Sequence, residues 1–86
     1  MQTILIIDDD EAIGNLEQEV LEGAGYAVRR AYSGTEALLL LKSHRPDLVL
    51  LDLMLPGLSG EAVLPQIKDI PVIVVSAKAS DRKSVV

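Results

Sequence analysis

The sequence predicts an α/β fold in which a parallel sheet is built from strands that alternate with helices. Two apolar runs, 4–7 and 48–51, end directly in aspartates. Continuous apolar runs of this length are typical of strands that are buried on both faces of a sheet. Segments with helical periodicity separate these runs from two further strand-like segments. Alternation at this spacing indicates βαβ units with right-handed crossovers.

The first helix is expected over residues 11–22, directly after the strand at 4–7. Asp10 is a suitable N-cap, and Glu11 in the first turn interacts favourably with the helix dipole. Gly23 and Gly25 then end the helix. The apolar residues expected to face the sheet are Ile13, Leu16, Val20 and Leu21.

A weaker strand at 26–31 is expected at the sheet edge, where Arg29 and Arg30 can reach water. Ser33 and Glu36 have the spacing of a capping box and open a second helix that runs to about Ser43. The sequence Arg45-Pro46 ends this helix and leads into the strand at 48–52. The buried stripe of the helix is expected to comprise Ala37, Leu38, Leu40 and Leu41.

The last expected elements are a short helix at about 61–68 and a buried strand at 70–76. Pro65 lies in the first turns of that helix, where a missing amide hydrogen does least harm. Ser80 and Asp81 can cap a further helix, but the sequence stops at Val86. We see no internal repeat and no linker.

The composition restricts the class of protein. The chain has 86 residues, a net charge of −5 and no cysteine, which predicts one domain without disulfides. The acidic balance argues against nucleic-acid binding by this segment. No apolar run approaches the roughly 20 residues needed to span a membrane. The N-terminus lacks the basic region of a signal peptide, so a cytoplasmic location is expected.

The candidate site comprises Asp8, Asp9 and Asp52, which follow or end two strands expected to be neighbours. The carboxyl ends of parallel strands meet at one edge of the sheet, where ligands bind. Three adjacent carboxylates repel one another, and a divalent cation would remove that conflict. Mg²⁺ is the natural choice because it accepts carboxylate and phosphate oxygens. Ser76 ends the fourth strand at the same edge and offers a hydroxyl to a bound anion.

These features together resemble the response-regulator receiver domain of two-component signalling. The resemblance covers all 86 residues and rests on an ordered set of motifs. They are the acidic pair after the first strand, Asp52, Met54-Leu55-Pro56, Gly60 and Ser76-Ala77-Lys78. The sequence of residues 53–57 is similar to the corresponding segment of regulators whose second domain is a winged-helix DNA binder.

The resemblance implies a role for each site residue. Asp52 would be the phosphoacceptor for a sensor histidine kinase. Asp8, Asp9 and Asp52 would hold Mg²⁺ together with the backbone carbonyl of Met54. Ser76 would bond the phosphoryl oxygen and move on activation. The implied fold is a flavodoxin-like, doubly wound parallel sheet.

The chain departs from the family pattern at its C-terminal end. The fifth strand, the last helix and the lysine that ends the fifth strand are missing, and Lys78 follows the fourth strand too closely to be that lysine. Residues 1–86 are therefore expected to form an incomplete receiver domain with strand order 2-1-3-4. The fourth strand would then be an open apolar edge, which favours a homodimer or exchange of elements between copies.

Two other functions remain open at this point. One is a receiver-like fragment or interaction module that no longer signals, which the missing lysine favours. The other is a haloacid-dehalogenase-like phosphatase, because Asp8-x-Asp10 after a first strand resembles the nucleophile motif of that family. Glu11 stands where that family usually has a threonine, and the phosphatase hypothesis leaves Asp52 and Ser76 unexplained.

Overall fold

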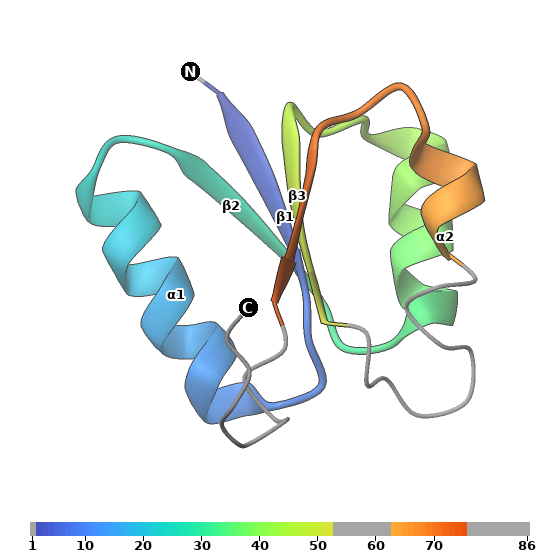
Figure 1. Cartoon of the computed structure of the whole chain (residues 1–86). Helices are drawn as coiled ribbons and strands as arrows, with labels where there is room; N and C mark the ends of the chain where they lie inside the picture. The colour runs from blue at the N-terminus through green and yellow to red at the C-terminus, as the bar shows by residue number, and fades with distance from the viewer. Residues whose placement is uncertain (1, 53–62, 76–86) are drawn as a thin grey trace.

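A parallel sheet of four strands forms the centre of the molecule (Figure 1). The computed structural model describes residues 2–52 and 63–75. The strands are β1 (Thr3–Ile7), β2 (Ala27–Ala31), β3 (Leu48–Asp52) and β4 (Val72–Val75), in the order β2-β1-β3-β4. All three pairings are parallel. The predicted α/β sheet and its 2-1-3-4 order are confirmed.

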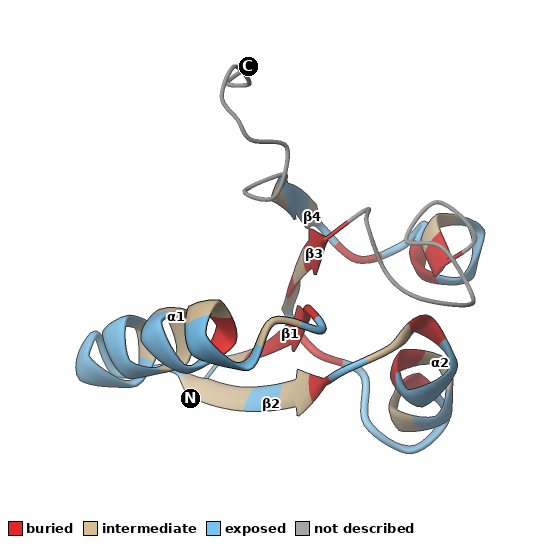
Figure 2. Ribbon diagram, turned by 90° about the horizontal axis from the view of Figure 1, so that it is seen from below, coloured by how far each residue is buried: buried red, intermediate tan, exposed pale blue. Residues whose placement is uncertain are grey.

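Helices cover both faces of this sheet. Helix α1 (Glu11–Gly23) lies on one face, while α2 (Gly34–Ser43) and the short 3₁₀ helix η1 (Leu64–Ile67) lie on the other (Figures 1 and 2). α1 lies beside β1 and β2, and no helix in the described ranges covers the same face at β3 and β4 (Figure 2). Within those ranges, no helix has both the length and the apolar character needed to cross a membrane.

The main core lies between the sheet and the α2–η1 layer. Ala37 and Leu41 of α2 are buried, and Leu38 and Leu40 pack against the same cluster, as predicted. The other fully buried members come from the strands and from the start and end of η1: Leu5, Ile7, Ala31, Val49, Leu51, Val63 and Ile67. The large apolar side chains among them contribute roughly 1.5–3 kcal/mol each. This core fixes β1 and β3 as the central strands.

The predicted N-caps of α1 and α2 are confirmed. The Asp10 carboxylate accepts a hydrogen bond of 3.0 Å from the amide of Ile13. The Ser33 hydroxyl accepts one of 3.1 Å from the amide of Glu36. The Glu36 carboxylate accepts a 2.8 Å bond from the amide of Tyr32, one residue before the cap. The turns that follow β1 and β2 are therefore held by side-chain bonds.

The predicted buried face of α1 is wrong at two positions. Leu16 is 61% exposed and Val20 is 62% exposed. Ile13 and Leu21 are half-buried as expected, and Gly14 is fully buried. The helix is therefore rotated relative to the apolar stripe that its sequence suggests.

Arg30 of β2 explains this orientation of α1. Its guanidinium Nη1 donates to Asn15 Oδ1 at 2.8 Å and to Gln18 Oε1 at 3.0 Å, so polar side chains of α1 face β2. A Cβ atom on Gly14 would clash with Arg30 Nη2, so the helix backbone closely approaches the guanidinium. The prediction that both strand arginines reach water holds for Arg29 but not for Arg30, which is half-buried.

The predicted last elements lie partly outside the described residues. Of the helix expected at 61–68, Val63 is helical and Leu64–Ile67 form η1, with Pro65 near its start, while residues 61 and 62 are not described. β4 begins at Val72, and the expectation that it is buried is wrong because Ile73 is 52% exposed. β4 is the outermost strand of the described sheet. The helix expected after Ser80 lies outside the described residues.

The close packing of Arg30 on Gly14 predicts an energetic coupling between these residues. In an Arg30→Ala background, Gly14→Ala should stabilise the protein by up to about 1 kcal/mol, because alanine favours a helix. With Arg30 present the methyl group displaces the guanidinium, so the gain should be smaller by about 1 kcal/mol. Urea unfolding of the wild type, the two single variants and the double variant measures this coupling. An equal gain in unfolding free energy from Gly14→Ala with and without Arg30 would contradict it.

Candidate functional site

Three aspartates meet at the carboxyl edge of the sheet. One carboxylate oxygen from each of Asp8, Asp9 and Asp52 lies within 4.8 Å of the other two. Asp8 and Asp52 are each only 3% exposed, whereas Asp9 is exposed. The convergence predicted from the sequence is therefore present in the structure.

The strand register positions the two buried carboxylates. Asp52 is the last residue of β3 and pairs with Val75 of β4. Asp8 follows β1, and its amide donates to the carbonyl oxygen of Ala31 at 3.0 Å, which extends the pairing with β2 by one residue. Since β1 and β3 pair in parallel through Ile7 and Leu51, the residues that follow these two emerge side by side.

The turn between β1 and α1 also holds Asp8. The Asp8 Oδ1 atom accepts a 2.8 Å hydrogen bond from the amide of Asp10, whose own side chain caps the helix. One turn therefore fixes the carboxylate of Asp8 and begins the helix that follows it. Asp9 lies between these two residues and faces solvent.

The donor set is suited to a hard cation. Each aspartate offers a carboxylate oxygen, and the three oxygens are close enough to share one ion. Hard divalent cations prefer such oxygen ligands. A bound cation would also offset the mutual repulsion of three adjacent carboxylates.

Glu17 is a fourth carboxylate near the site that the sequence analysis missed. It is half-buried on α1, and burial raises the pKa of its side chain. Repulsion by Asp8 and Asp52 raises the pKa further, while Arg30 acts in the opposite direction. The signal in the sequence was positional, since Glu17 lies four residues from both Ile13 and Leu21 and so shares their sheet-facing side.

The remaining predicted site residues cannot be placed in this arrangement. Met54, whose backbone carbonyl was expected to bind the metal, lies outside the described residues, and so do Ser76 and Lys78. Their assigned roles stay predictions.

The fold and the site define an α/β protein with an acidic site at the carboxyl edge of its parallel sheet. Comparisons with known proteins define its family. Residues 4–86 match the family described as the response regulator receiver domain. The polar-differentiation response regulator DivK of Brucella anthropi is 40% identical over 84 residues, which cover 91% of this chain and 68% of DivK. The chain therefore belongs to the response regulator receiver domain family.

Solved structures agree with this assignment. The N-terminal domain of a response regulator receiver protein from Methanoculleus marisnigri is 40% identical and superposes with a TM-score of 0.84, covering 90% of this chain and 68% of that one. The receiver domain of Francisella response regulator 1452 is 31% identical and superposes with a TM-score of 0.83. This match covers 93% of this chain and 69% of the Francisella chain. The flavodoxin-like fold expected from the sequence is thereby confirmed.

Membership of this family separates the functional alternatives. Receiver domains belong to two-component signalling and are switches rather than metabolic enzymes. The family match gives no support to the haloacid-dehalogenase-like alternative.

The environment of Glu17 predicts a pH-dependent gain in stability for Glu17→Gln. Because the folded-state pKa is raised above its ordinary value of 4.5, the ionised side chain destabilises the fold at neutral pH. Glu17→Gln should therefore be more stable at pH 7, by about 0.5 kcal/mol or less because solvent screens a half-exposed charge. The gain should vanish below pH 4.5. Thermal unfolding with a chelator present, from pH 3.5 to 7, tests this, and a gain that persists at pH 3.5 would contradict it.

Proposed function

We propose that this chain is a phosphoacceptor domain in which Asp52 accepts a phosphoryl group from a sensor histidine kinase. The observation that carries this proposal is the convergence of Asp52 with Asp8 and Asp9 at the edge of the sheet. Three carboxylates so close together are costly unless they bind a cation or a reacting group. Family membership supports the same function.

The proposed reaction transfers one phosphoryl group to a side chain of this protein. A carboxylate oxygen of Asp52 attacks the phosphorus of the partner's phosphohistidine. The P–N bond breaks as the P–O bond forms, which leaves an acyl phosphate on Asp52 and returns the electron pair to the imidazole. Asp52 is only 3% exposed at the end of β3, and packing this close would restrict the orientation of the attacking oxygen.

We propose that Mg²⁺ is the cation that belongs to this site. Asp8, Asp9 and Asp52 would hold it, together with the carbonyl of Met54. When bound, it would neutralise negative charge on the carboxylates and on the phosphoryl oxygens. The hydroxyl of Ser76 would donate a hydrogen bond to a phosphoryl oxygen, and its movement would carry the signal to an output or dimer surface.

The wider setting of this proposal follows the same family. We propose that residues 1–86 act as one receiver unit in the cytoplasm, with a histidine kinase as the phosphoryl donor. The alternative is a receiver-like interaction module that is not phosphorylated. The two differ in whether a covalent phosphate forms on Asp52.

Treatment with acetyl phosphate and Mg²⁺ should add one phosphoryl group to the protein. Intact-mass measurement should show the adduct in the wild type and its loss in Asp52→Asn. Asp47→Asn is a matched control, because Asp47 is an exposed aspartate just before β3, at the opposite end of that strand from Asp52, and its carboxylate accepts a hydrogen bond from the amide of Thr3. It should be phosphorylated like the wild type.

The site of the adduct decides among the alternatives. Peptide mapping that places the phosphate on Asp8 would favour the phosphatase chemistry and contradict the proposal. A folded sample with no adduct under these conditions would support the module that does not signal.

Mg²⁺ should stabilise the wild-type protein by binding to the folded state. At a hundredfold excess over Kd, the expected gain in unfolding free energy is about 2.7 kcal/mol. Asp9→Asn removes one exposed ligand without disturbing the core and should reduce this gain strongly. Asp47→Asn should keep it. Thermal unfolding across a Mg²⁺ titration measures both, and an equal gain in Asp9→Asn would exclude Asp9 as a ligand.

We also propose that the outer edge of β4 mediates homodimerisation or exchange of elements. β4 is the last strand of the described sheet, and its apolar Ile73 and Val74 are about half exposed. Charged residues on an edge strand prevent edge-to-edge pairing. Ile73→Lys should therefore weaken self-association in sedimentation velocity measurements. Association of Ile73→Lys that matches the wild type would contradict this role of the edge.

A further inference from the structure

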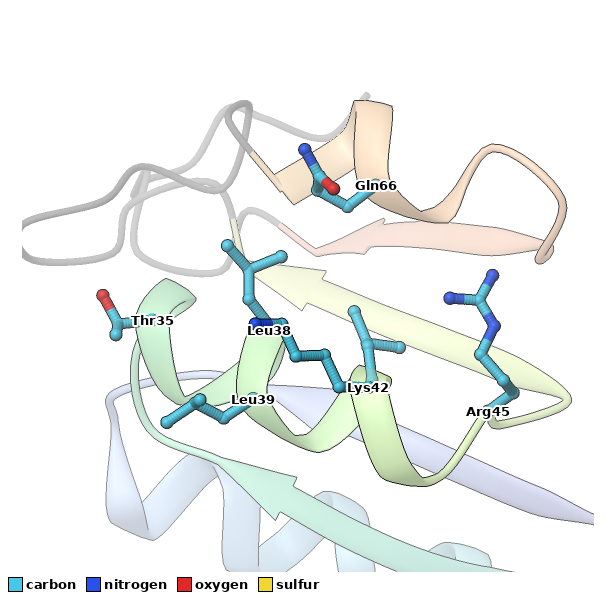
Figure 3. A pocket seen from close by; sticks show the side chains of 7 residues that line it. Thr35, Leu38, Leu39, Lys42, Arg45 and Gln66 are labelled. Atoms are coloured by element: carbon cyan, nitrogen blue, oxygen red, sulfur yellow. The ribbon is translucent and has the colours of Figure 1, made fainter.

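A groove of about 460 Å³ lies between α2 and η1, on the face of the sheet opposite α1 (Figure 3). Leucines of α2, including Leu38 and Leu39, form its apolar part, and Gln66 of η1 lies across from them. Leu39 is 62% exposed. The groove therefore presents an apolar surface that nothing in the described part of the chain covers fully.

Two cations stand along this groove. Lys42 lies in the last turn of α2, and Arg45 follows the helix (Figure 3). Arg45 forms an exposed ion pair with Asp69, which offsets part of its charge and leaves Lys42 as the main source of positive charge in the groove lining. These basic side chains belong to a chain whose net charge is −5. The groove is thus suited to an apolar ridge that carries negative charge.

Helix α1 has such a ridge. Ala12, Leu16 and Val20 are spaced four residues apart and are all exposed, so they form one apolar row on the helix surface. The exposed Glu19 lies beside this row. α1 carries four glutamates and neither lysine nor arginine. Its exposed surface is therefore apolar and acidic, whereas the groove is apolar and basic.

We propose that the α1 ridge of one molecule docks into the α2–η1 groove of a second copy of this chain. The two surfaces cannot meet within one molecule, because the sheet separates α1 from α2 and η1 (Figures 1 and 2). An amphipathic helix that lays its apolar face in a groove is a common mode of recognition. The opposite charges favour this pairing over ridge against ridge or groove against groove.

The contact is heterologous, because each copy uses one surface as ridge and a different one as groove. Such contacts form rings or open chains instead of symmetric dimers. The contact therefore differs from pairing through β4, in which the β4 edge of one molecule would meet the β4 edge of a second. It also allows a test by complementation between two different variants.

Two substitutions block the two halves of the contact separately. Leu16→Glu places a charge on the ridge and leaves the groove intact, while Leu39→Glu does the reverse. Both side chains are more than 60% exposed, so neither change should disturb the core. Both variants carry Ile73→Lys, which is expected to weaken association through the β4 edge. Gln2→Glu in the same background adds the same charge at an exposed position that belongs neither to the ridge nor to the groove lining.

Sedimentation velocity measures the association of each variant alone and of an equimolar mixture of Leu16→Glu and Leu39→Glu. The Ile73→Lys protein and its Gln2→Glu control should associate beyond a dimer as concentration rises. Leu16→Glu and Leu39→Glu alone should associate at least about tenfold more weakly. Their mixture should form a one-to-one dimer that grows no further, because only one intact ridge and one intact groove remain in each pair.

Three results would overturn the proposal. The Ile73→Lys protein could stay monomeric at all concentrations, which would exclude the contact. The single variants could associate like their parent, which would place the contact elsewhere. The mixture could fail to form a dimer although circular dichroism shows both variants folded, which would exclude pairing of ridge with groove. Weaker association at high salt would support the role of Lys42 and Arg45.

Discussion

The parallel pairing of β1 with β3 is the constraint on which the site depends. Residues 4–7 of β1 lie opposite residues 48–51 of β3, and most of these side chains are buried. Such burial contributes roughly 1.5–3 kcal/mol for each large apolar side chain. Because Asp8 follows one strand and Asp52 ends the other, the pairing that forms the core also brings the two carboxylates together. The stability of the core thus offsets their repulsion.

The local hydrogen bonds around the site use the same residues for two purposes. The Asp8 carboxylate accepts a hydrogen bond from the amide of Asp10, and the Asp10 side chain caps α1. The start of the helix and the orientation of a site carboxylate are therefore set by one short turn. Arg30 adds a cation between β2 and α1, where it acts on the half-buried Glu17 and opposes the influence of the aspartates on that group. The negative charge at the carboxyl edge of the sheet is therefore offset in part by Arg30, which lies between β2 and α1.

Much of this arrangement could be predicted from the sequence, because it depends on local signals. Apolar runs that end in aspartate predicted β1, β3 and the position of the site. The spacing of Ser33 and Glu36 predicted a helix start that the structure confirms. The rotation of α1 could not be predicted, because a helical stripe of Leu16 and Val20 does not reveal that an arginine on the next strand will bind Asn15 and Gln18. The exposure of Ile73 likewise depends on which elements cover β4, and periodicity within a strand does not contain that information.

The packing of Arg30 on Gly14 has a consequence for how this sequence can change over generations. A side chain at position 14 and a long guanidinium at position 30 compete for the same space. A substitution at either position therefore alters which residues are tolerated at the other, although sixteen positions of sequence separate them. In related chains, an evolutionary record of correlated replacement at these two positions would mark the seam between helix and strand, independently of selection on the acidic edge.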